Sequence, residues 1–158
     1  MASIGIIIEE EYLFHEIISW FKKLFVILQP CRDVSDIFKH KPRYPIFENT
    51  MISLMVNSTF RMYQESAYWR SPNAVCHSYG WSLDIKRIEF AKIYQRRGFG
   101  LRLFQWLHEN TPTDIIFVER VTTMALNDFL IKNQNILYAI RCNNSPTDWI
   151  IKKINLSA

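Results

Sequence analysis

The chain has 158 residues, of which 49% are hydrophobic and 15% aromatic, and its formal net charge is +4 at pH 7. This length fits a single domain over residues 1–158, with enough apolar side chains for a real core. The positive charge favours anionic partners without choosing among them. The three cysteines form no Cys-x-x-Cys unit and cannot all pair, so we expect no metal site and a reducing cytoplasm.

The first 30 residues contain two apolar patterns. Ile4–Ile8 is a β-branched run that predicts a short first strand, ended by three glutamates. This start lacks the basic segment and long apolar core of a signal peptide, which again favours the cytoplasm. Apolar side chains then follow the spacing of an amphipathic helix that ends before Pro30: Phe14, Ile17, Ile18, Phe21, Leu24, Phe25 and Leu28. Charged residues in its middle argue against a membrane span, so we expect this helix to pack on a sheet and expect no membrane partner.

Residues 31–73 give weaker signals. The polar, basic stretch 31–47 predicts a short helix followed by a loop, either a solvated connector or part of a substrate site. Asn49 or Thr50 would cap a second helix. The apolar residues of that helix would be Met51, Leu54, Met55 and Met62. Their weak alternation also permits a strand over 55–63, and both interpretations stay open.

The next part of the chain predicts a hairpin. Two runs rich in β-branched and aromatic residues, Val75–Ser82 and Ile85–Tyr94, are separated by Leu83 and Asp84, which we expect between the two strands. The second run alternates charged and apolar side chains in the order Arg87, Ile88, Glu89 and Phe90. One face of this strand is therefore expected to be apolar and the other charged.

The last third predicts alternating helices and strands. The expected elements are a helix over Gly98–Asn110, a buried strand over Asp114–Val121, a helix capped by Thr122 or Thr123 and reaching about Asn133, and a terminal hairpin of Ile136–Cys142 and Trp149–Leu156. The order of all these elements predicts an α/β fold built on one mixed sheet.

A pair of glycines marks the most informative stretch. Only four glycines occur in the chain, and Gly98 and Gly100 stand between a predicted strand and a predicted helix. Such a turn exposes backbone N–H groups, and the start of the helix adds unpaired donors and the positive dipole end, which favours phosphate or pyrophosphate. Three arginines surround the turn: Arg96, Arg97 and Arg102. The alternative, an ordinary loop with solvated arginines, stays open because short glycine motifs match by chance.

The run Ile88–Gly100 carries a resemblance to a known family. It is not the dinucleotide fingerprint, since Leu103 stands where the third glycine would be, and it is no P-loop, since no Gly-Lys-Ser/Thr follows. It resembles motif A of the GNAT superfamily of acyl-CoA-dependent N-acyltransferases, in which a strand is followed by Gln/Arg-x-x-Gly-x-Gly/Ala and a helix. The resemblance implies a mixed central sheet with helices on both faces and two neighbouring parallel strands that splay around the acyl-CoA arm. Ile85–Tyr94 and Asp114–Val121 would be that pair.

The resemblance also implies a cofactor site. In the family the strand offers backbone groups to the pantetheine arm, and the loop and helix start hold the pyrophosphate. Carried over to this chain, the residues expected to bind the cofactor are Phe90, Ala91, Gln95, Arg96, Arg97, Gly98, Phe99, Gly100, Leu101 and Arg102. The implied activity is direct transfer of an acyl group, most simply from acetyl-CoA, to an amine acceptor that the sequence does not reveal.

Acyl transfer to an amine requires a base for the amine's proton and an acid for the departing thiolate. Glu89 is our first candidate for the base, although an ion pair with Arg87 or Lys92 on a solvated face is an equally good interpretation. Glu119, near the end of the next predicted strand, and Asp84 are the second candidates.

One position departs from the family pattern, in which a Tyr in the helix after the buried strand often serves as the thiolate's acid. If Phe129–Asn135 aligns with the end of that pattern, Leu130 replaces the Tyr, and Thr123 stands for the family's Asn. Tyr94, Tyr138 or water would then protonate the thiolate, or catalysis is lost.

Two further functions therefore stay open. The first is a GNAT-like module that binds CoA or a macromolecule without catalysis. The second is modification of nucleic acid, as in the DNA-modifying Mom proteins of phages, which also resemble GNAT folds; Tyr68 or Trp69 near Arg70 would stack on bases. The sequence leaves open whether the protein is a monomer or a homodimer.

Overall fold

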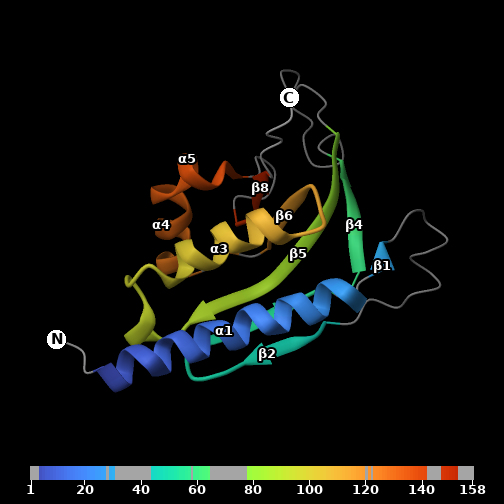
Figure 1. The fold of residues 1–158 in the computed structure, drawn as a ribbon. Coiled ribbons are helices and arrows are strands. Elements are labelled where there is room, and N and C mark those ends of the chain that lie inside the picture. Colours follow the sequence, from blue (N-terminus) through green and yellow to red (C-terminus); the bar gives the residue numbers. More distant parts are fainter. Residues whose placement is uncertain are drawn as a thin grey trace.

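The computed structural model describes residues 4–27, 29–30, 44–57, 59–64, 78–119, 121, 123–141 and 147–152. Within them a mixed sheet and helices form an α/β fold (Figure 1). The strands are β1 (Gln29–Pro30), β2 (Ile46–Glu48), β3 (Ile52–Val56), β4 (Thr59–Gln64), β5 (Ser78–Phe90), β6 (Ile115–Val118), β7 (Ala139–Arg141) and β8 (Trp149–Lys152). The helices are α1 (Ile4–Ile27), α3 (Phe99–Asn110), α4 (Met124–Lys132), α5 (Gln134–Leu137) and the short 3₁₀ turn η2 (Lys92–Tyr94).

The strands join in the order β1-β4-β5-β6-β8-β7, and the β2–β3 pair is attached to β5 through β3. β5 is the longest of them and runs through the middle of the molecule (Figure 1). One half of β5 pairs antiparallel with β4 and the other half with β3, while β6 pairs parallel with its middle. β5 therefore connects the N-terminal strands to the C-terminal ones.

The expected first strand, Ile4–Ile8, is wrong, because α1 begins at Ile4. The three glutamates that follow are good helix formers, and they extend the amphipathic pattern toward the N-terminus instead of ending a strand. The predicted apolar stripe of the helix is confirmed, since Phe14, Ile17, Ile18, Phe21 and Leu24 are all buried. Among the described residues, no helix has the length and apolar character that a membrane span requires.

The second helix, expected to carry residues 51–62, is also wrong. The structure has β3 and β4 there, which agrees in part with the alternative strand over 55–63. In β3 every second side chain is buried, as a strand with one covered face requires. The predicted short helix and loop fall largely on residues 31–43, which lie outside the described residues.

The hairpin expected at Leu83 and Asp84 does not form, because β5 passes through both residues without a break. Leu83 lies opposite Ile116 of β6, and Asp84 lies opposite Phe117. An aspartate is unfavourable inside a strand, but the Asp84 carboxylate accepts a hydrogen bond of 2.7 Å from the Ser82 hydroxyl. The antiparallel partners of β5 are β3 and β4 instead.

β5 contains a β-bulge at Lys86. Its register with β3 shifts so that Val56 lies opposite Ile85, whereas Met55 lies opposite Arg87. The extra residue reverses the alternation, so Ile88 resumes the same face as Ile85. Beyond the bulge, the expected alternation of apolar and charged side chains is confirmed, since Ile88 is buried and Glu89 is exposed.

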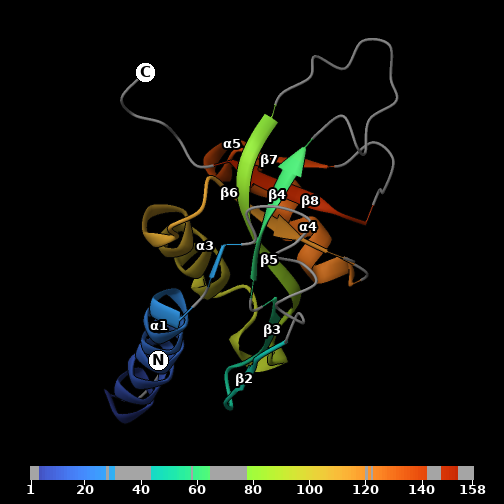
Figure 2. The ribbon, with the colours of Figure 1, turned by 90° about the vertical axis from the view of Figure 1, so that its right-hand side faces the viewer.

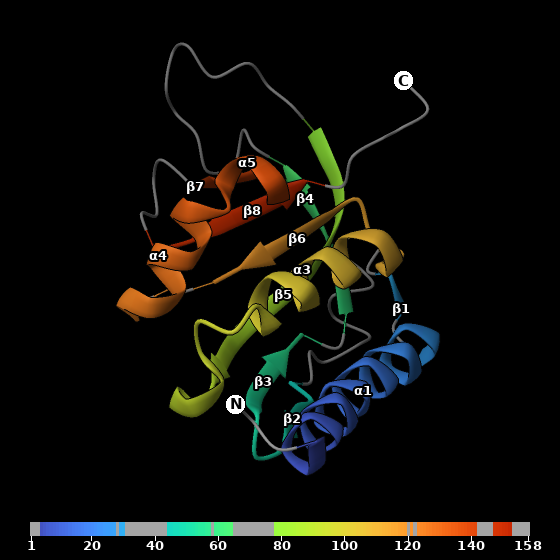
Figure 3. The same ribbon diagram turned by 60° about the vertical axis from the view of Figure 1, so that its left-hand side comes forward.

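One hydrophobic core fills the space between the sheet and the helices. It includes Phe21 of α1, Leu103 of α3, Leu130 of α4 and Leu137 of α5, together with Leu83 and its neighbours on one face of the sheet. Figure 3 shows these helices on the near side of the sheet, and Figure 2 shows α1 and α3 side by side next to β5. Helices on both faces were expected, but the helices of the described residues cover only one face.

The C-terminal predictions agree better with the structure. Helix α3, the buried strand β6 and helix α4 lie where they were expected, and the Thr123 hydroxyl caps α4 by accepting a bond from Leu126 N–H. The first terminal strand starts later than predicted, because α5 takes residues 134–137 and β7 starts only at Ala139. The predicted end of the second terminal strand, residues 153–156, lies outside the described residues.

Candidate functional site

β5 and β6 are parallel neighbours over part of their length only. Their paired residues run from Ser82 and Ile115 to Ile85 and Val118, and Glu119 N–H then donates a bond of 3.0 Å to the Ile85 carbonyl. β5 continues along β3 to its end, whereas β6 stops. We call the point where the two strands part the β5–β6 fork. The expected parallel pair is therefore present.

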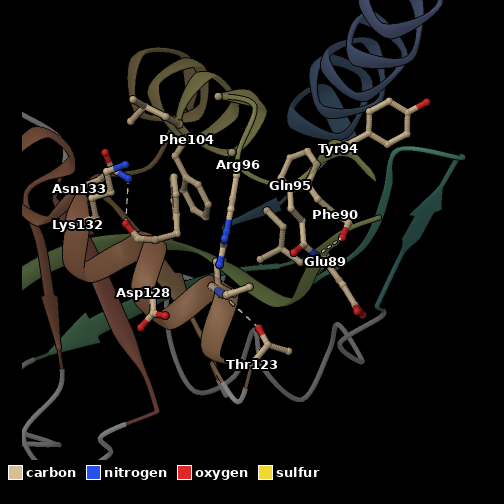
Figure 4. Close-up of a pocket in the computed structure, with 17 residues that line it drawn as sticks. Glu89, Phe90, Tyr94, Gln95, Arg96, Phe104, Thr123, Asp128, Lys132 and Asn133 are labelled. Carbon is tan, nitrogen blue, oxygen red and sulfur yellow. Dashed lines mark hydrogen bonds between the residues drawn. The ribbon is translucent and has the colours of Figure 1, made fainter. Parts of the chain in front are cut away.

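A pocket of about 440 Å³ opens beside this fork (Figure 4). Its walls come from the end of β5, from the turn and first residues of α3, and from α4. Small-molecule sites occupy roughly 300–1,000 Å³, so this volume suits part of a ligand the size of an acyl-pantetheine. Six of the residues expected to bind a cofactor line it: Phe90, Gln95, Arg96, Gly98, Gly100 and Leu101. The other four expected residues are not among its lining: Ala91, Arg97, Phe99 and Arg102.

The turn before α3 has the backbone that the glycine pair predicted. Gly98 has a φ of +86° and caps α3 without any side-chain hydrogen bond, which leaves the first N–H groups of the helix as donors. Arg96 is also left-handed, with a φ of +60°, which is uncommon for a residue with a Cβ. Gln95 fixes the turn to the sheet, because its side-chain amide donates a bond of 2.8 Å to the Phe90 carbonyl.

Two of the three arginines near the turn are held by α1. Arg97 forms an ion pair with Glu10, whose side chain is only 8% exposed. Arg102 donates two hydrogen bonds, of 2.6 and 2.9 Å, to the carboxylate of Glu11. These bonds lower the pKa of Glu11 below its ordinary 4.5 and raise the pKa of Arg102. We call these two ion pairs the α1–α3 clasp.

The clasp corrects the expected roles of Arg97 and Arg102. Both guanidinium groups also lie over aromatic rings of the core edge, Arg97 over Phe99 at 5.8 Å and Arg102 over Phe14 at 4.2 Å. The Phe99 ring itself is buried against Phe14. These residues join α3 to α1 and do not face the pocket.

Arg96 is the arginine that faces the pocket. Figure 4 shows its side chain reaching from the turn into the pocket. Within the described part of the chain it has no ion pair or hydrogen bond. Lys132 and Asp128 of α4 line the same pocket, and Glu89 lines it from β5, so the favourable place for an anion is the turn itself, where Arg96 and the start of α3 lie.

The two backbone positions expected to face a pantetheine, Phe90 and Ala91, differ in whether their polar groups are already hydrogen-bonded. Ala91 N–H donates to the Met51 carbonyl at 2.8 Å, and the Ala91 carbonyl accepts from Tyr94 N–H, so both of its polar groups are used. Successive N–H groups of a strand point to opposite edges, which directs Phe90 N–H away from β3 and toward the fork. Phe90 remains a suitable backbone contact, and Ala91 does not.

The two expected carboxylate bases lie in different surroundings. Glu89 is exposed, and its neighbour Arg87 pairs instead with Glu48 at 3.6 Å, so the expected pair with Arg87 does not form. Figure 4 shows the Glu89 side chain turned away from Arg96 and Asp128. Glu119 forms an ion pair of 2.6 Å with Lys86 across the fork, so its carboxylate already has a cationic partner.

The residues considered for the thiolate's acid lie in different surroundings, and Tyr94 is the one that lines the pocket. Leu130, which would replace the family's Tyr if Phe129–Asn135 aligns with the family pattern, is fully buried in the core. The Tyr94 side chain is buried, and Figure 4 shows its hydroxyl pointing toward α1 and away from Asp128. Tyr138 is 49% exposed and stacks on His108, away from the pocket lining.

Several pocket residues were not expected from the sequence. Asp128 and Lys132 come from α4, and Asn133 is the C-cap of that helix. Asp128 and Lys132 are exposed residues four apart on a helix, a pattern that does not indicate a pocket. The Asn133 side chain is buried and donates a bond of 2.9 Å to the Phe129 carbonyl. Among the described residues, no three His, Cys, Asp or Glu side chains gather in a metal-binding group. Residues 68–70, named for nucleic-acid stacking, lie outside the described part.

Comparisons with protein-family models, with curated proteins and with solved structures find no match for this chain.

Proposed function

We propose that the protein is an acyl-CoA-dependent N-acyltransferase of GNAT-like architecture, with acetyl-CoA as the simplest donor. The observation that carries this proposal is the position of the pocket, which opens at the β5–β6 fork directly beside a left-handed glycine turn. A donor with an anionic pyrophosphate and a narrow pantetheine arm matches these two features. The strand order β5-β6-β8-β7 also supports the proposal.

The donor is proposed to lie along the pocket with its pyrophosphate at the turn. Arg96 and the first N–H groups of α3 would bind the phosphate oxygens. The pantetheine arm would follow the end of β5, where Phe90 N–H is directed toward the fork. The thioester would then lie near the Ile88 and Phe90 side of β5, between the strand and α4.

The reaction proposed here is direct transfer. The amine nitrogen attacks the thioester carbonyl, Glu89 accepts the amine's proton, the C–S bond breaks, and the thiolate takes a proton from water. Water is assigned to that step because Tyr94 points away and Leu130 is buried. Glu89 would act best as a base when the bound substrates exclude water around it.

A second candidate is a CoA-binding module without turnover. Leu130 at 0% exposure favours it, because no hydroxyl occupies the place that the family uses for an acid. The two candidates share the binding step and differ only in whether an amine is acylated.

The test is a calorimetric titration of acetyl-CoA into the protein and into Arg96→Glu. Loss of a charge-assisted contact and reversal of its charge should weaken binding by at least about tenfold. Lys22→Glu is the matched control, since this exposed residue of α1 undergoes the same charge change and does not line the pocket. Equal affinity in all three proteins, or no binding at all, would contradict the proposal.

A further inference from the structure

The outer face of α1 carries large apolar side chains that the rest of the described chain leaves exposed. Ile8, Tyr12 and Val26 are 64%, 65% and 83% exposed. Figures 2 and 3 both show α1 at the edge of the molecule, so this face is open to a partner. Single exposed apolar residues are common on protein surfaces, but apolar residues that share one face of a helix can mark an interaction surface.

These apolar residues belong to one straight stripe along the helix. At 3.6 residues per turn, five exposed side chains of α1 point within about 60° of one another: Ile8, Tyr12, His15, Ser19 and Val26. We call these five residues the α1 stripe. It lies opposite the buried face of α1 and extends over about 27 Å, with apolar residues toward both ends and polar ones in the middle.

Charges are divided unequally along the α1 stripe. Glu9 and Glu11 flank its first half, whereas Lys22 and Lys23 flank its second half. Among the described residues, Glu9, Lys22 and Lys23 have no ion-pair or hydrogen-bond partner, and all three are exposed. A second copy of α1 running in the opposite direction would therefore place basic side chains beside acidic ones, whereas a parallel copy would place like charges together.

We propose that two copies of the protein associate through the α1 stripe, with their α1 helices antiparallel. This inference is independent of the acyltransferase proposal. A two-fold axis that passes beside Ile17 packs Ile8 against Val26 of the second copy, and Val26 against Ile8 of the second copy. The same axis brings His15 to Ser19 of the second copy, so the polar middle of the stripe meets itself.

The register that pairs Ile8 with Val26 also pairs the charges. With a rise of 1.5 Å per residue, Glu9 is offset by only about 3 Å along the helix from Lys23 of the second copy, on the same flank of the contact. On the other flank Glu11, which is already bonded to Arg102, is offset by about 1.5 Å from Lys22 of the second copy. One register therefore satisfies the apolar and the ionic contacts together.

A second copy suits this face better than a lipid surface does. The charged side chains along the α1 stripe include Glu9, Glu11 and Glu16 against two lysines, and an anionic membrane favours the opposite balance. The contact is short and partly polar, and Glu16 lies near its own copy at the rim. We therefore expect a weak, reversible dimer.

The test is sedimentation velocity of the full chain over protein concentrations of about 5–500 µM, where we expect a monomer–dimer equilibrium with a dissociation constant on the order of 10–100 µM. Ile8→Lys places a cation against Val26 and near both lysines of the second copy, and should weaken association at least about tenfold. Met124→Lys is the matched control, because Met124 is 79% exposed on α4 and should leave association unchanged. Circular dichroism checks that each variant is folded.

Charge reversal tests the antiparallel direction. Lys23→Glu and Glu9→Lys each create two like-charge contacts in the dimer and should each weaken it about tenfold at low salt, and the double variant should recover affinity to within about threefold of the original protein. In a parallel dimer Lys23→Glu would change nothing, since like charges would face each other before and after. A protein that stays monomeric throughout, a dimer that Ile8→Lys leaves intact, or a double variant no tighter than the single ones would overturn the proposal.

Discussion

Arg96 and Gly98 share a left-handed backbone, but they differ in what that conformation costs. Glycine adopts a positive φ without strain, whereas a residue with a Cβ does so at a cost of roughly 1 kcal/mol. Arg96 adopts this less favourable conformation in a turn from which its side chain enters the pocket. Strained residues that persist often serve a site, which agrees with the role proposed for Arg96.

Gly98→Ala should lower the free energy of unfolding by about 1 kcal/mol, since alanine is strained at a φ of +86°. A Cβ there would meet no atom within 4 Å, so the cost comes from the backbone alone. Gly100→Ala is the control, because its Cβ would make an ordinary contact with Phe129 at 3.4 Å inside a helix. Urea denaturation measures both, and equal losses would show that the left-handed turn is not the cause.

At the scale of elements, the α1–α3 clasp attaches α1 to the helix that begins at the glycine turn. Its partners are far apart in the chain, Glu11 and Arg102 being separated by 91 residues. Phe21 and Phe25 of α1 continue the contact by packing against Trp106 of α3. The clasp therefore fixes the start of α3, and with it the turn, relative to α1.

Glu11→Gln should destabilise the protein at pH 7 and cease to do so in acid. The pKa of Glu11 is lowered in the folded protein by the hydrogen bonds from Arg102, so its contribution is present above pH 4.5 and disappears as the pH falls through the lower folded value. Both side chains are 45% exposed, so the effect should stay below about 1 kcal/mol. Unfolding of both proteins at pH 7 and pH 3 measures this, and an equal difference at both pH values would contradict it.

At the scale of the whole molecule, one core joins the N-terminal helix to the C-terminal elements. We therefore expect residues 1–158 to unfold in one cooperative transition, as the single-domain prediction requires. Phe21→Ala should lower the free energy of unfolding by about 3–5 kcal/mol, because this ring is fully buried between α1 and α3.

Val26→Ala is the control for Phe21→Ala, since Val26 is 83% exposed on the same helix and should change stability by less than about 0.5 kcal/mol. Denaturation followed by both circular dichroism and tryptophan fluorescence measures the effect. Two transitions that separate, with Phe21→Ala shifting only one of them, would show that α1 is not part of one cooperative unit.

Features encoded locally were predictable from the sequence, and features that depend on distant partners were not. The turn at Gly98 and the cap at Thr123 follow from single residues whose geometry few others tolerate. The continuity of β5 through Asp84 was missed, because its pairing with Phe117 joins residues far apart in sequence.

Long sequence separation between contacting residues also explains the wrong predictions at the site and in the N-terminal part of the chain. Nothing near Arg97 and Arg102 indicates that α1 holds them, so three arginines were expected where one faces the pocket. β3 was mistaken for a helix because its neighbour β2 is only three residues long and its other partner, β5, lies more than 20 residues further along the chain. Arg96 differs from Arg97 and Arg102 in its left-handed backbone and in the direction of its side chain, and no sequence pattern reports either.

The position of β5 in the sheet has a consequence for synthesis on the ribosome. The strands before it attach through β3 and β4, and those after it attach through β6, so the earlier half has no central strand until residue 90 has emerged. The pocket is completed later still, when α4 at residues 124–132 closes its last wall. The growing chain therefore carries a half-built sheet for much of its elongation, and the proposed donor can bind only once most of the protein has left the exit tunnel.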